Sequence, residues 1–513
     1  MKKRKSTSRR TVRRFLRSRL PVVLLLFLQI AVLAYVAVSG SRLSQAFAGL
    51  LSGVSILAAL FILATKGENA YKLTWIFWIL CVPVFGGLFY VILHAQWTKK
   101  HFAERSAACE REIKALLCPS AEGVLAPSDR LLESGTLRYL SESVGYPAYR
   151  SEGSTYFPSA EEMLKALLTA LRNAKKYIFL EYFIIEEGRM WGAILDVLKE
   201  KAREGVLVRV LYDEVGCFPH LPKRYFKRLR AHGIEAYAFH PFVSMLSVEQ
   251  NNRDHRKIAV IDGEIAFTGG VNLADEYINL TSRFGHWKDA ALMVKGGAAW
   301  AFALIFLQMW ELTRQTGEDH SRYRPTFSPS EAQALVLPYA DSPMDGESVG
   351  ENVYLSILRE ARRYVYITTP YLIISDTMRT ALSLAAKSGV DVRIITPAIW
   401  DKRVVHAVTR SYYAELIDEG VKIYEYTPGF IHAKLVVSDD RIATVGSINF
   451  DYRSLYLHFE CGALLYGGET VQRIKEDFLR TEALSEQISP QPTGRGFFRR
   501  LYYAVLRLLA PLL

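Results

Sequence analysis

The chain has 513 residues, half of them hydrophobic, and a formal net charge of +12. The positive charge lies at the ends: residues 1–19 hold ten Lys and Arg and no acid, residues 494–513 contribute +4, and the body, 120–493, is left with −6. A nucleic-acid enzyme normally concentrates positive charge on its working domain, so this distribution disfavours a nucleic-acid partner and favours an anionic membrane surface. The five cysteines are scattered and lack metal-binding spacing, which argues against a disulfide framework.

The basic tail, 1–19, precedes three apolar segments at about 20–39, 46–65 and 73–96, each of membrane-spanning length and free of charged residues. Buried core helices are the alternative. The tail places the N-terminus in the cytoplasm, and we expect a multi-pass protein of the cell membrane. The third segment contains Pro83 and Gly86, so it either crosses the membrane or re-enters it. Three crossings would put the body outside; a re-entrant third segment and the basic residues that follow it favour the cytoplasmic face.

After a linker, 97–150, the same order of predicted elements occurs in 151–330 and again in 331–490. Each half is predicted to contain helix, strand, helix, strand and then a further strand. The run AKKYIFLEY at 174–182 parallels ARRYVYITT at 361–369, and GVLVRVL at 205–211 parallels GVDVRII at 389–395. This repetition predicts an α/β fold with two pseudo-symmetric halves, each with a mainly parallel sheet covered by helices.

The last predicted strand of each half is part of a motif with the pattern His-x-Lys-x4-Asp. Its two copies are His255, Lys257 and Asp262 in the first half, and His432, Lys434 and Asp439 in the second. Six more residues then lead to a Gly-small-x-Asn tail that ends at Asn272 in one copy and Asn449 in the other. Two accidental copies with the same tail at the same offset are implausible, so we predict one composite site.

The chemistry of these residue types fits a phosphodiester substrate. Side chains alternate along a strand, so each histidine shares a face with its lysine. Two lysines can neutralise the non-bridging phosphate oxygens. A neutral histidine can attack phosphorus, and a second, protonated histidine can give a proton to the leaving alkoxide. A lysine two residues from each histidine repels a cation, so we expect no metal.

Other polar residues near the motifs have two possible roles. Asp289 and Glu460 are candidates to fix the second ring nitrogen of the catalytic histidines, or else surface acids. The motif aspartates, Asp262 and Asp439, either act in catalysis or set hairpin turns. A third group either completes the phosphate pocket or forms the turn after the strand: Asn272, Ser447 and Asn449.

The C-terminal segment, 491–513, has apolar residues at helical spacing, with arginines elsewhere on the turn. This pattern predicts a short basic amphipathic helix at a membrane interface. A helix docked on the body is the alternative.

The paired motifs resemble the signatures of the phospholipase D superfamily. Further segments resemble bacterial cardiolipin synthases: NNRDHRKI at 251–258, FTGGVN at 267–272, WKD at 287–289, TPY at 369–371 and GSINFDYRS at 446–454. The resemblance covers about residues 70–513. One departure is the presence of three apolar segments at the N-terminus where two are common.

The resemblance implies a pseudo-twofold α/β/α fold whose motif strands meet where the halves join. It implies transfer of a phosphatidyl group between two phosphatidylglycerol molecules, giving cardiolipin and glycerol through a phosphohistidine, with His255 favoured as nucleophile. Phosphatidylglycerol and anionic membrane lipids are then the expected partners, without nucleotide, metal or other cofactor.

Several alternatives remain open at the level of sequence. A phospholipase D-type hydrolase would use water as acceptor, and another phosphatidyltransferase would use a different alcohol. A membrane-tethered nuclease is disfavoured by the acidic body, and a non-catalytic scaffold by the presence of all six motif residues. The sequence contains no pattern that indicates the oligomeric state or the acyl-chain preference.

Overall fold

The computed structural model describes residues 41–64, 69–81, 96–117, 134–150, 153–239, 252–326, 334–489 and 497–512, with scattered residues between 31 and 39 and Tyr90. The chain divides into two compact units. The smaller one contains the helices α2 (Arg42–Ala64) and α3 (Asn69–Cys81), which pack through a small cluster around Trp75 and Ile79. The larger one contains both motif-bearing halves.

The helix α2 covers most of the apolar segment predicted at 46–65. The segment at 20–39 lies almost wholly, and that at 73–96 in large part, outside the described residues. No helix in the part of the chain that the structure describes is long and apolar enough to span a membrane. The predicted membrane-spanning helices are therefore not confirmed.

The first half contains a seven-stranded sheet in the order β2-β9-β7-β6-β3-β4-β5. Its elements are β2 (Thr155–Phe157), α7 (Ala160–Arg172), β3 (Tyr177–Tyr182), α8 (Arg189–Arg203), β4 (Leu207–Asp213), α9 (Glu214–Cys217), α10 (Phe226–Arg230), β5 (Glu235–Phe239), β6 (Lys257–Ile261), β7 (Ile265–Gly269), β8 (His286–Lys288), β9 (Ala291–Lys295), α11 (Gly297–Arg314) and η4 (His320–Tyr323).

The second half contains a nine-stranded sheet in the order β1-β10-β19-β17-β16-β11-β13-β14-β20. Its elements are β10 (Leu335–Asp341), α12 (Val349–Glu360), β11 (Tyr364–Thr368), β12 (Leu372–Ile373), α13 (Asp376–Lys387), β13 (Asp391–Pro397), α14 (Arg403–Asp418), β14 (Lys422–Tyr426), β15 (Gly429–Ile431), β16 (Leu435–Ser438), β17 (Ile442–Gly446), β18 (Phe450–Asp451), α15 (Tyr452–Tyr456), β19 (Glu460–Tyr466), α16 (Glu469–Glu482) and β20 (Ser485–Gln487).

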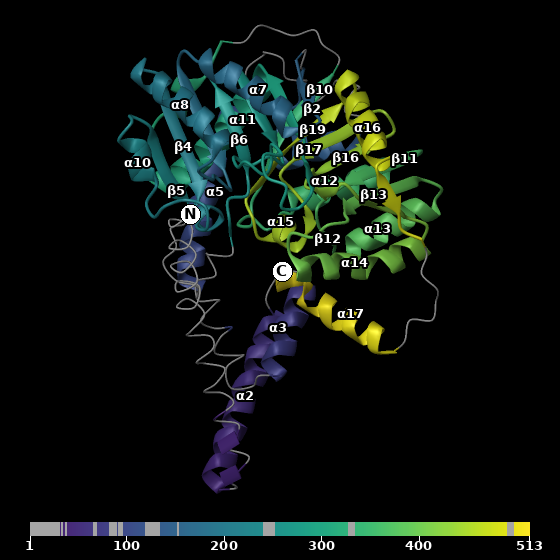
Figure 1. Ribbon diagram of the computed structural model, residues 1–513. Coiled ribbons are helices and arrows are strands. Elements are labelled where there is room, and N and C mark those ends of the chain that lie inside the picture. Colours follow the sequence, from purple (N-terminus) through teal and green to yellow (C-terminus); the bar gives the residue numbers. More distant parts are fainter. Residues whose placement is uncertain are drawn as a thin grey trace. The chain divides into compact units, whose positions relative to one another are not determined.

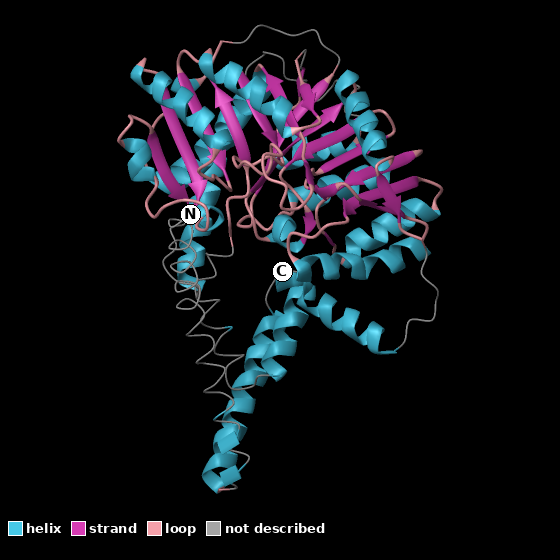
Figure 2. Ribbon diagram, in the orientation of Figure 1, coloured by secondary structure: helices cyan, strands magenta, loops and turns pink. Residues whose placement is uncertain are grey.

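Among the described residues, four more elements lie between α3 and the first half, and two follow the second half. They are α5 (Gln96–Leu117), α6 (Gly135–Arg138), η2 (Tyr139–Val144) and β1 (Tyr149–Arg150), then α17 (Phe497–Leu509) and η5 (Ala510–Leu512). The strand β1 pairs with β10, so the end of the predicted linker contributes to the sheet of the second half. Helices flank the strands of the two sheets, and the helix α11 contacts both sheets (Figures 1 and 2).

Local sequence explains why the covering helices begin where they do. The side chain of Ser159 accepts a hydrogen bond from the backbone N–H of Glu162 and caps α7, and Ser375 caps α13 through Met378. The helix α11 is apolar on all sides, and fourteen of its eighteen residues are buried. A helix of this kind belongs in a core, and α11 packs on β6 and β7 of one sheet and β10 of the other.

The expectation of mainly parallel sheets is wrong. In the main sheet of each half only three strands run parallel, β3-β4-β5 and β11-β13-β14. Each motif strand pairs antiparallel with both of its neighbours. The physical reason is the tight turn after the motif. It folds β6 back onto β7, and β16 back onto β17, and a tight hairpin can only join antiparallel strands. The fold is thus a mixed α/β fold with two repeated halves.

The two halves are joined by backbone pairing next to the motif histidines. The strand β8 of the first half pairs in parallel with β15 of the second, and an isolated bridge joins Asp254 to Phe459. The backbone N–H of His255 donates to the carbonyl of Phe459 at 2.9 Å, and that of His432 donates to the carbonyl of Lys288 at 2.7 Å. These equivalent bonds place each histidine against the chain of the opposite half.

Candidate active site

The motif histidines lie just before the strands β6 and β16, where the halves meet. His255 and His432 are 8% and 7% exposed, and their lysines, Lys257 and Lys434, are 1% exposed each. His432 and Lys434 both precede β16, so the predicted alternation along one strand does not describe them. Each lysine nevertheless lies close enough to its histidine for its charge to lower the pKa of that ring. Each lysine ammonium also donates a hydrogen bond to the backbone carbonyl of its own histidine.

Each catalytic histidine candidate contacts a carboxylate from the other half. The Nδ1 of His255 lies 2.9 and 3.0 Å from the two carboxylate oxygens of Glu460, and the Nδ1 of His432 lies 2.7 Å from Oδ2 of Asp289. The structure thus brings both predicted carboxylates to the histidines, but each comes from the half without its histidine. The crossing follows from the backbone bonds above, because Phe459 and Lys288 directly precede Glu460 and Asp289.

These pairs determine the tautomer of the histidines. A carboxylate can only accept, so the Nδ1 atoms of His255 and His432 carry the protons and donate. The Nε2 atom of each neutral ring then keeps its lone pair, which is the form required of a nucleophile or a base. The carboxylates of Glu460 and Asp289 are completely buried, so they hold the rings without competition from water.

The site brings together four side chains that carry positive charge when protonated, namely the two motif histidines and the two motif lysines. Burial and the two lysines lower the pKa of His255 well below its usual range, and burial and Lys434 lower that of His432 to about 4. Burial lowers the pKa of Lys257 to about 8 and that of Lys434 to about 7, and the nearby carboxylates of Asp289 and Glu460 offset part of this effect. A bound anion would reverse these shifts, so the arrangement is suited to an anionic group such as a phosphodiester.

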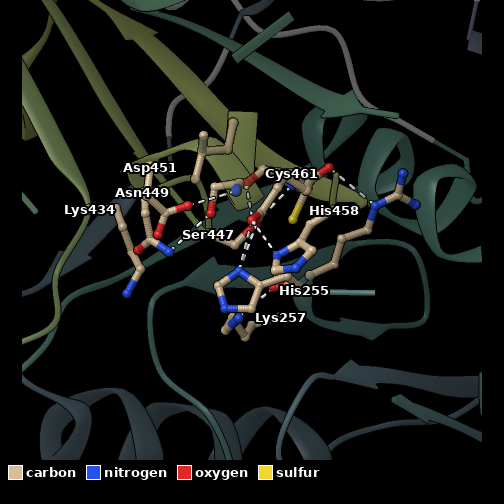
Figure 3. Close-up of polar contacts among 12 residues, drawn as sticks. His255, Lys257, Lys434, Ser447, Asn449, Asp451, His458 and Cys461 are labelled. Atoms are coloured by element: carbon tan, nitrogen blue, oxygen red, sulfur yellow. Dashed lines mark hydrogen bonds and ion pairs between the residues drawn. The ribbon is translucent and has the colours of Figure 1, made fainter. Parts of the chain in front are cut away.

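Ser447 supports one of the two dyads (Figure 3). Its hydroxyl donates to Glu460 Oε2 at 2.5 Å and accepts from the backbone N–H of Cys461 at 3.0 Å. Glu460 therefore holds both Ser447 and His255, which fixes the carboxylate before any substrate arrives. This contact gives Ser447 a place in the site beyond that of a turn residue.

The two motif asparagines lie in the same region and bind neighbouring loops. Asn272 accepts from the backbone N–H of Ile184 at 3.0 Å and donates to the hydroxyl of Tyr277 at 2.7 Å. The ring of Tyr277 stands edge-on to that of His432, 5.5 Å between centroids. Asn449 donates to Ser454 at 3.0 Å. These contacts give both asparagines a role in holding the loops around the site.

The motif aspartates lie at the other end of the motif strands, about 20 Å from the histidines at the usual rise per strand residue. The carboxylate of Asp262 accepts from the backbone N–H groups of residues 175–177 at 2.7–2.8 Å, and that of Asp439 from those of residues 362–364 at 2.7–2.9 Å. Both adopt positive φ, 54° and 53°, at the hairpin turn. Their place and contacts favour the turn-setting alternative over a catalytic role.

A third histidine lies beside the first dyad and was not singled out by the sequence patterns. The ring of His458 is 5.5 Å from that of His255, and its Nδ1 lies 3.8 Å from Glu460. Burial lowers its pKa to about 3, so the ring is neutral. His255, His458 and Glu460 bring potential metal-ligating atoms within 4.8 Å of one another. The hydrogen bond between His255 and Glu460 already occupies two of these groups, and the absence of a metal remains a prediction.

Comparisons with known proteins agree on the type of fold and site. The family described as "Cardiolipin synthase, PLD-like domain" matches residues 167–285 and 354–481. A cardiolipin synthase of Alkalihalophilus pseudofirmus is 36% identical over 492 residues, covering 93% of this chain and 96% of the relative. One of Geobacillus kaustophilus is 34% identical over 482 residues, covering 92% and 95%. These relatives confirm the resemblance that the motifs indicated.

A solved structure with a similar fold is phosphatidylserine synthase of Haemophilus influenzae. It superposes with a TM-score of 0.56 at 14% identity, covering 74% of this chain and 100% of that chain. At this level of identity the likeness concerns the fold alone. It agrees with two repeated halves of mixed α/β structure.

Proposed function

Because the chain belongs to the cardiolipin synthase family of phospholipase D-like proteins, we propose that it transfers a phosphatidyl group between two phosphatidylglycerol molecules. The products are cardiolipin and glycerol. The observation that supports this proposal most directly is the pair of crossed histidine–carboxylate contacts next to two buried lysines.

In the first step, Nε2 of His255 attacks phosphorus of the donor lipid, and the bond from phosphorus to the glycerol head group breaks. His432, protonated in the complex with the anionic substrate, gives its proton to the leaving alkoxide, and glycerol departs. Lys257 and Lys434 neutralise the non-bridging oxygens as charge builds up. The product of this step is a phosphohistidine that carries the phosphatidyl group.

In the second step, a hydroxyl of a second phosphatidylglycerol head group attacks the phosphohistidine. His432, now neutral, takes the proton of that hydroxyl, the bond between phosphorus and Nε2 breaks, and cardiolipin is released. His432 thus changes from acid to base between the steps, which requires a ring whose pKa responds to the charge bound beside it. The buried His432–Asp289 pair has this property.

The principal test compares acceptors. Purified full-length protein in mixed micelles with phosphatidylglycerol labelled in its head group should release one labelled glycerol for each cardiolipin formed. Phosphatidic acid as the sole lipid product would mean that water is the acceptor and would replace this proposal by a hydrolase. Variants His255→Ala and His432→Ala should each lose turnover, and full activity in either one would contradict a shared site.

We also propose that the protein resides in the cell membrane with its catalytic body on the cytoplasmic face. The support is the basic tail, 1–19, and the three apolar segments that follow it. The helix α2 also exposes large apolar side chains on more than one side, with Leu50, Leu57 and Phe61 along one side and Ile56 and Leu63 along another. Fusion of a reporter that fluoresces only in the cytoplasm to the C-terminus should give fluorescent cells. A fusion to a periplasmic or extracellular reporter should be inactive.

A further inference from the structure

The connection between β13 and α14 exposes large apolar side chains beside cations. Ile399, Trp400 and Val404 are 37%, 49% and 51% exposed, and Lys402 and Arg403 between them are also exposed. We call residues 399–404 the 399–404 segment. Three large apolar side chains left in water within six residues are costly and mark a contact surface. Asp401 lies 3.6 Å from the ammonium of Lys402 and offsets one of the two cations. The remaining positive charge indicates that the partner carries negative charge.

This segment borders the catalytic site. Tyr371 donates to Asp401 at 2.5 Å, and the ammonium of Lys402 lies 5.0 Å from the centre of the same tyrosine ring. The tyrosine ring is 6.5 Å from that of Phe430, which in turn is 6.0 Å from the ring of His432. The charge of Lys402 also contributes to the lowered pKa of His255. A partner bound to the segment therefore lies next to the place where phosphorus must arrive.

The C-terminal helix α17 adds a second apolar face along the same helix α14 (Figure 1). It is docked through buried Leu506, and its Arg507 donates to Glu415 at 2.7 Å and to the backbone carbonyl of Ser411 at 2.6 Å. Three other apolar side chains of α17 are exposed by about half: Leu501, Tyr502 and Val505. Docking thus uses one side of α17 and leaves another apolar side uncovered. The helix has both of the properties predicted as alternatives, a contact with the body and a free apolar face.

We propose that the 399–404 segment and the exposed face of α17 form the surface by which the catalytic body rests on an anionic phospholipid bilayer. Aromatic and aliphatic side chains beside cations are the composition that enters the head-group region of such a membrane. This surface would deliver the head group of a membrane lipid to His255 and His432 while the acyl chains stay in the bilayer. The proposal rests on the proposed function in one respect, namely that the substrate is a membrane phospholipid.

The test uses full-length protein and two forms of phosphatidylglycerol. One form is long-chain lipid in proteoliposomes; the other is short-chain lipid below its micelle concentration. The variant Ile399→Ser, Trp400→Ser, Val404→Ser should lose at least tenfold in rate on bilayer substrate and stay within twofold of the native protein on monomeric substrate. The matched control is Leu479→Ser on α16, because Leu479 is 38% exposed, nearly the same as Ile399. It should keep both rates.

A second measurement does not depend on turnover. Phosphatidylglycerol brominated along its acyl chains should quench the fluorescence of Trp400, measured as the difference between native protein and Trp400→Phe in proteoliposomes. Equal losses on both substrates, or absence of this quenching, would overturn the proposal. If the segment instead joined two copies of the chain, Trp400 would be protected from quenching, and the native protein would have a larger mass than the triple variant. This result would also overturn the proposal. If the native protein were inactive on both lipids, the proposed function would be refuted. The quenching measurement would still decide whether this surface contacts the bilayer.

Discussion

The two crossed carboxylates allow the roles of the histidines to be separated by exchanging a single atom. Glu460→Gln and Asp289→Asn keep the shape of each side chain and replace one carboxylate oxygen with an amide NH₂. The new amide can donate to Nδ1, which favours the ring tautomer with its proton on Nε2 and removes the lone pair needed for attack. The same substitution in a Ser-His-Asp triad lowers kcat by about 10⁴.

The burial of these groups determines the expected magnitude. Both carboxylates are completely buried, and Glu460 accepts hydrogen bonds from the side chains of His255 and Ser447 at 2.5–3.0 Å. Water cannot replace the lost charge at such a site, so we expect each variant to lose about 10³- to 10⁴-fold in kcat. This loss corresponds to about 4–5.5 kcal/mol of transition-state stabilisation.

The assay is a burst experiment with a phosphatidyl ester of p-nitrophenol, whose leaving group needs no acid. If His255 is the nucleophile, Asp289→Asn should release one equivalent of nitrophenol at nearly the native rate and then stall, whereas Glu460→Gln should show no burst. The opposite pattern would make His432 the nucleophile. Full bursts followed by native turnover in both variants would refute the argument that the carboxylates set the tautomers.

Three further predictions concern stability, pH and metal. Asp262→Ala should lower the free energy of unfolding by about 3 kcal/mol in urea titrations, because it leaves the backbone N–H groups of residues 175–177 unpaired. The kcat per folded molecule should change less than threefold. A loss of kcat comparable to that of His255→Ala would instead support a catalytic role for Asp262. In pH profiles, kcat/KM should fall as pH rises from about 7 to 9, because Lys434 and Lys257, with pKa values of about 7 and 8 in the free protein, lose the charge that binds phosphate. The kcat profile should fall at higher pH, because the bound anion raises both pKa values. Exhaustive chelation should leave turnover unchanged, and a loss restored by zinc would indicate a metal held by His255, His458 and Glu460.

Sequence alone could predict the repeat and the histidines, lysines and carboxylates that the structure brings together. The local spacing of each motif predicts that its histidine and lysine lie close together, and the structure places each lysine where its charge acts on its histidine. The α/β character and the two halves follow from the repeated order of elements. The antiparallel pairing of the motif strands was also accessible, because the hairpin turns at Asp262 and Asp439 were visible in the sequence. The alternation of helices and strands outweighed that signal in the prediction.

The crossing of the carboxylates could not be predicted. Glu460 is 205 residues from His255, and Asp289 is 143 from His432, so neither contact has a local signal. Only the docking of the halves, through β8–β15 and the bridge at Asp254, decides which acid meets which ring. The motif also led to the prediction of its aspartates as catalytic residues. They follow the motif strand, however, and therefore lie at the end of the strand that is far from the histidine. A motif marks residues that are required together, and such residues need not meet.

The crossed pairs also have a consequence for how the protein is made. The ribosome delivers His255 well before Glu460, so the first half leaves the exit tunnel without the acid that orients its histidine. His432 arrives after Asp289, but the two can meet only when the second half docks on the first. Neither ring is therefore ordered for attack during synthesis, and both become so in a single event, the closure of the two halves on each other. A partly made chain therefore lacks both of the oriented rings on which the proposed reaction depends.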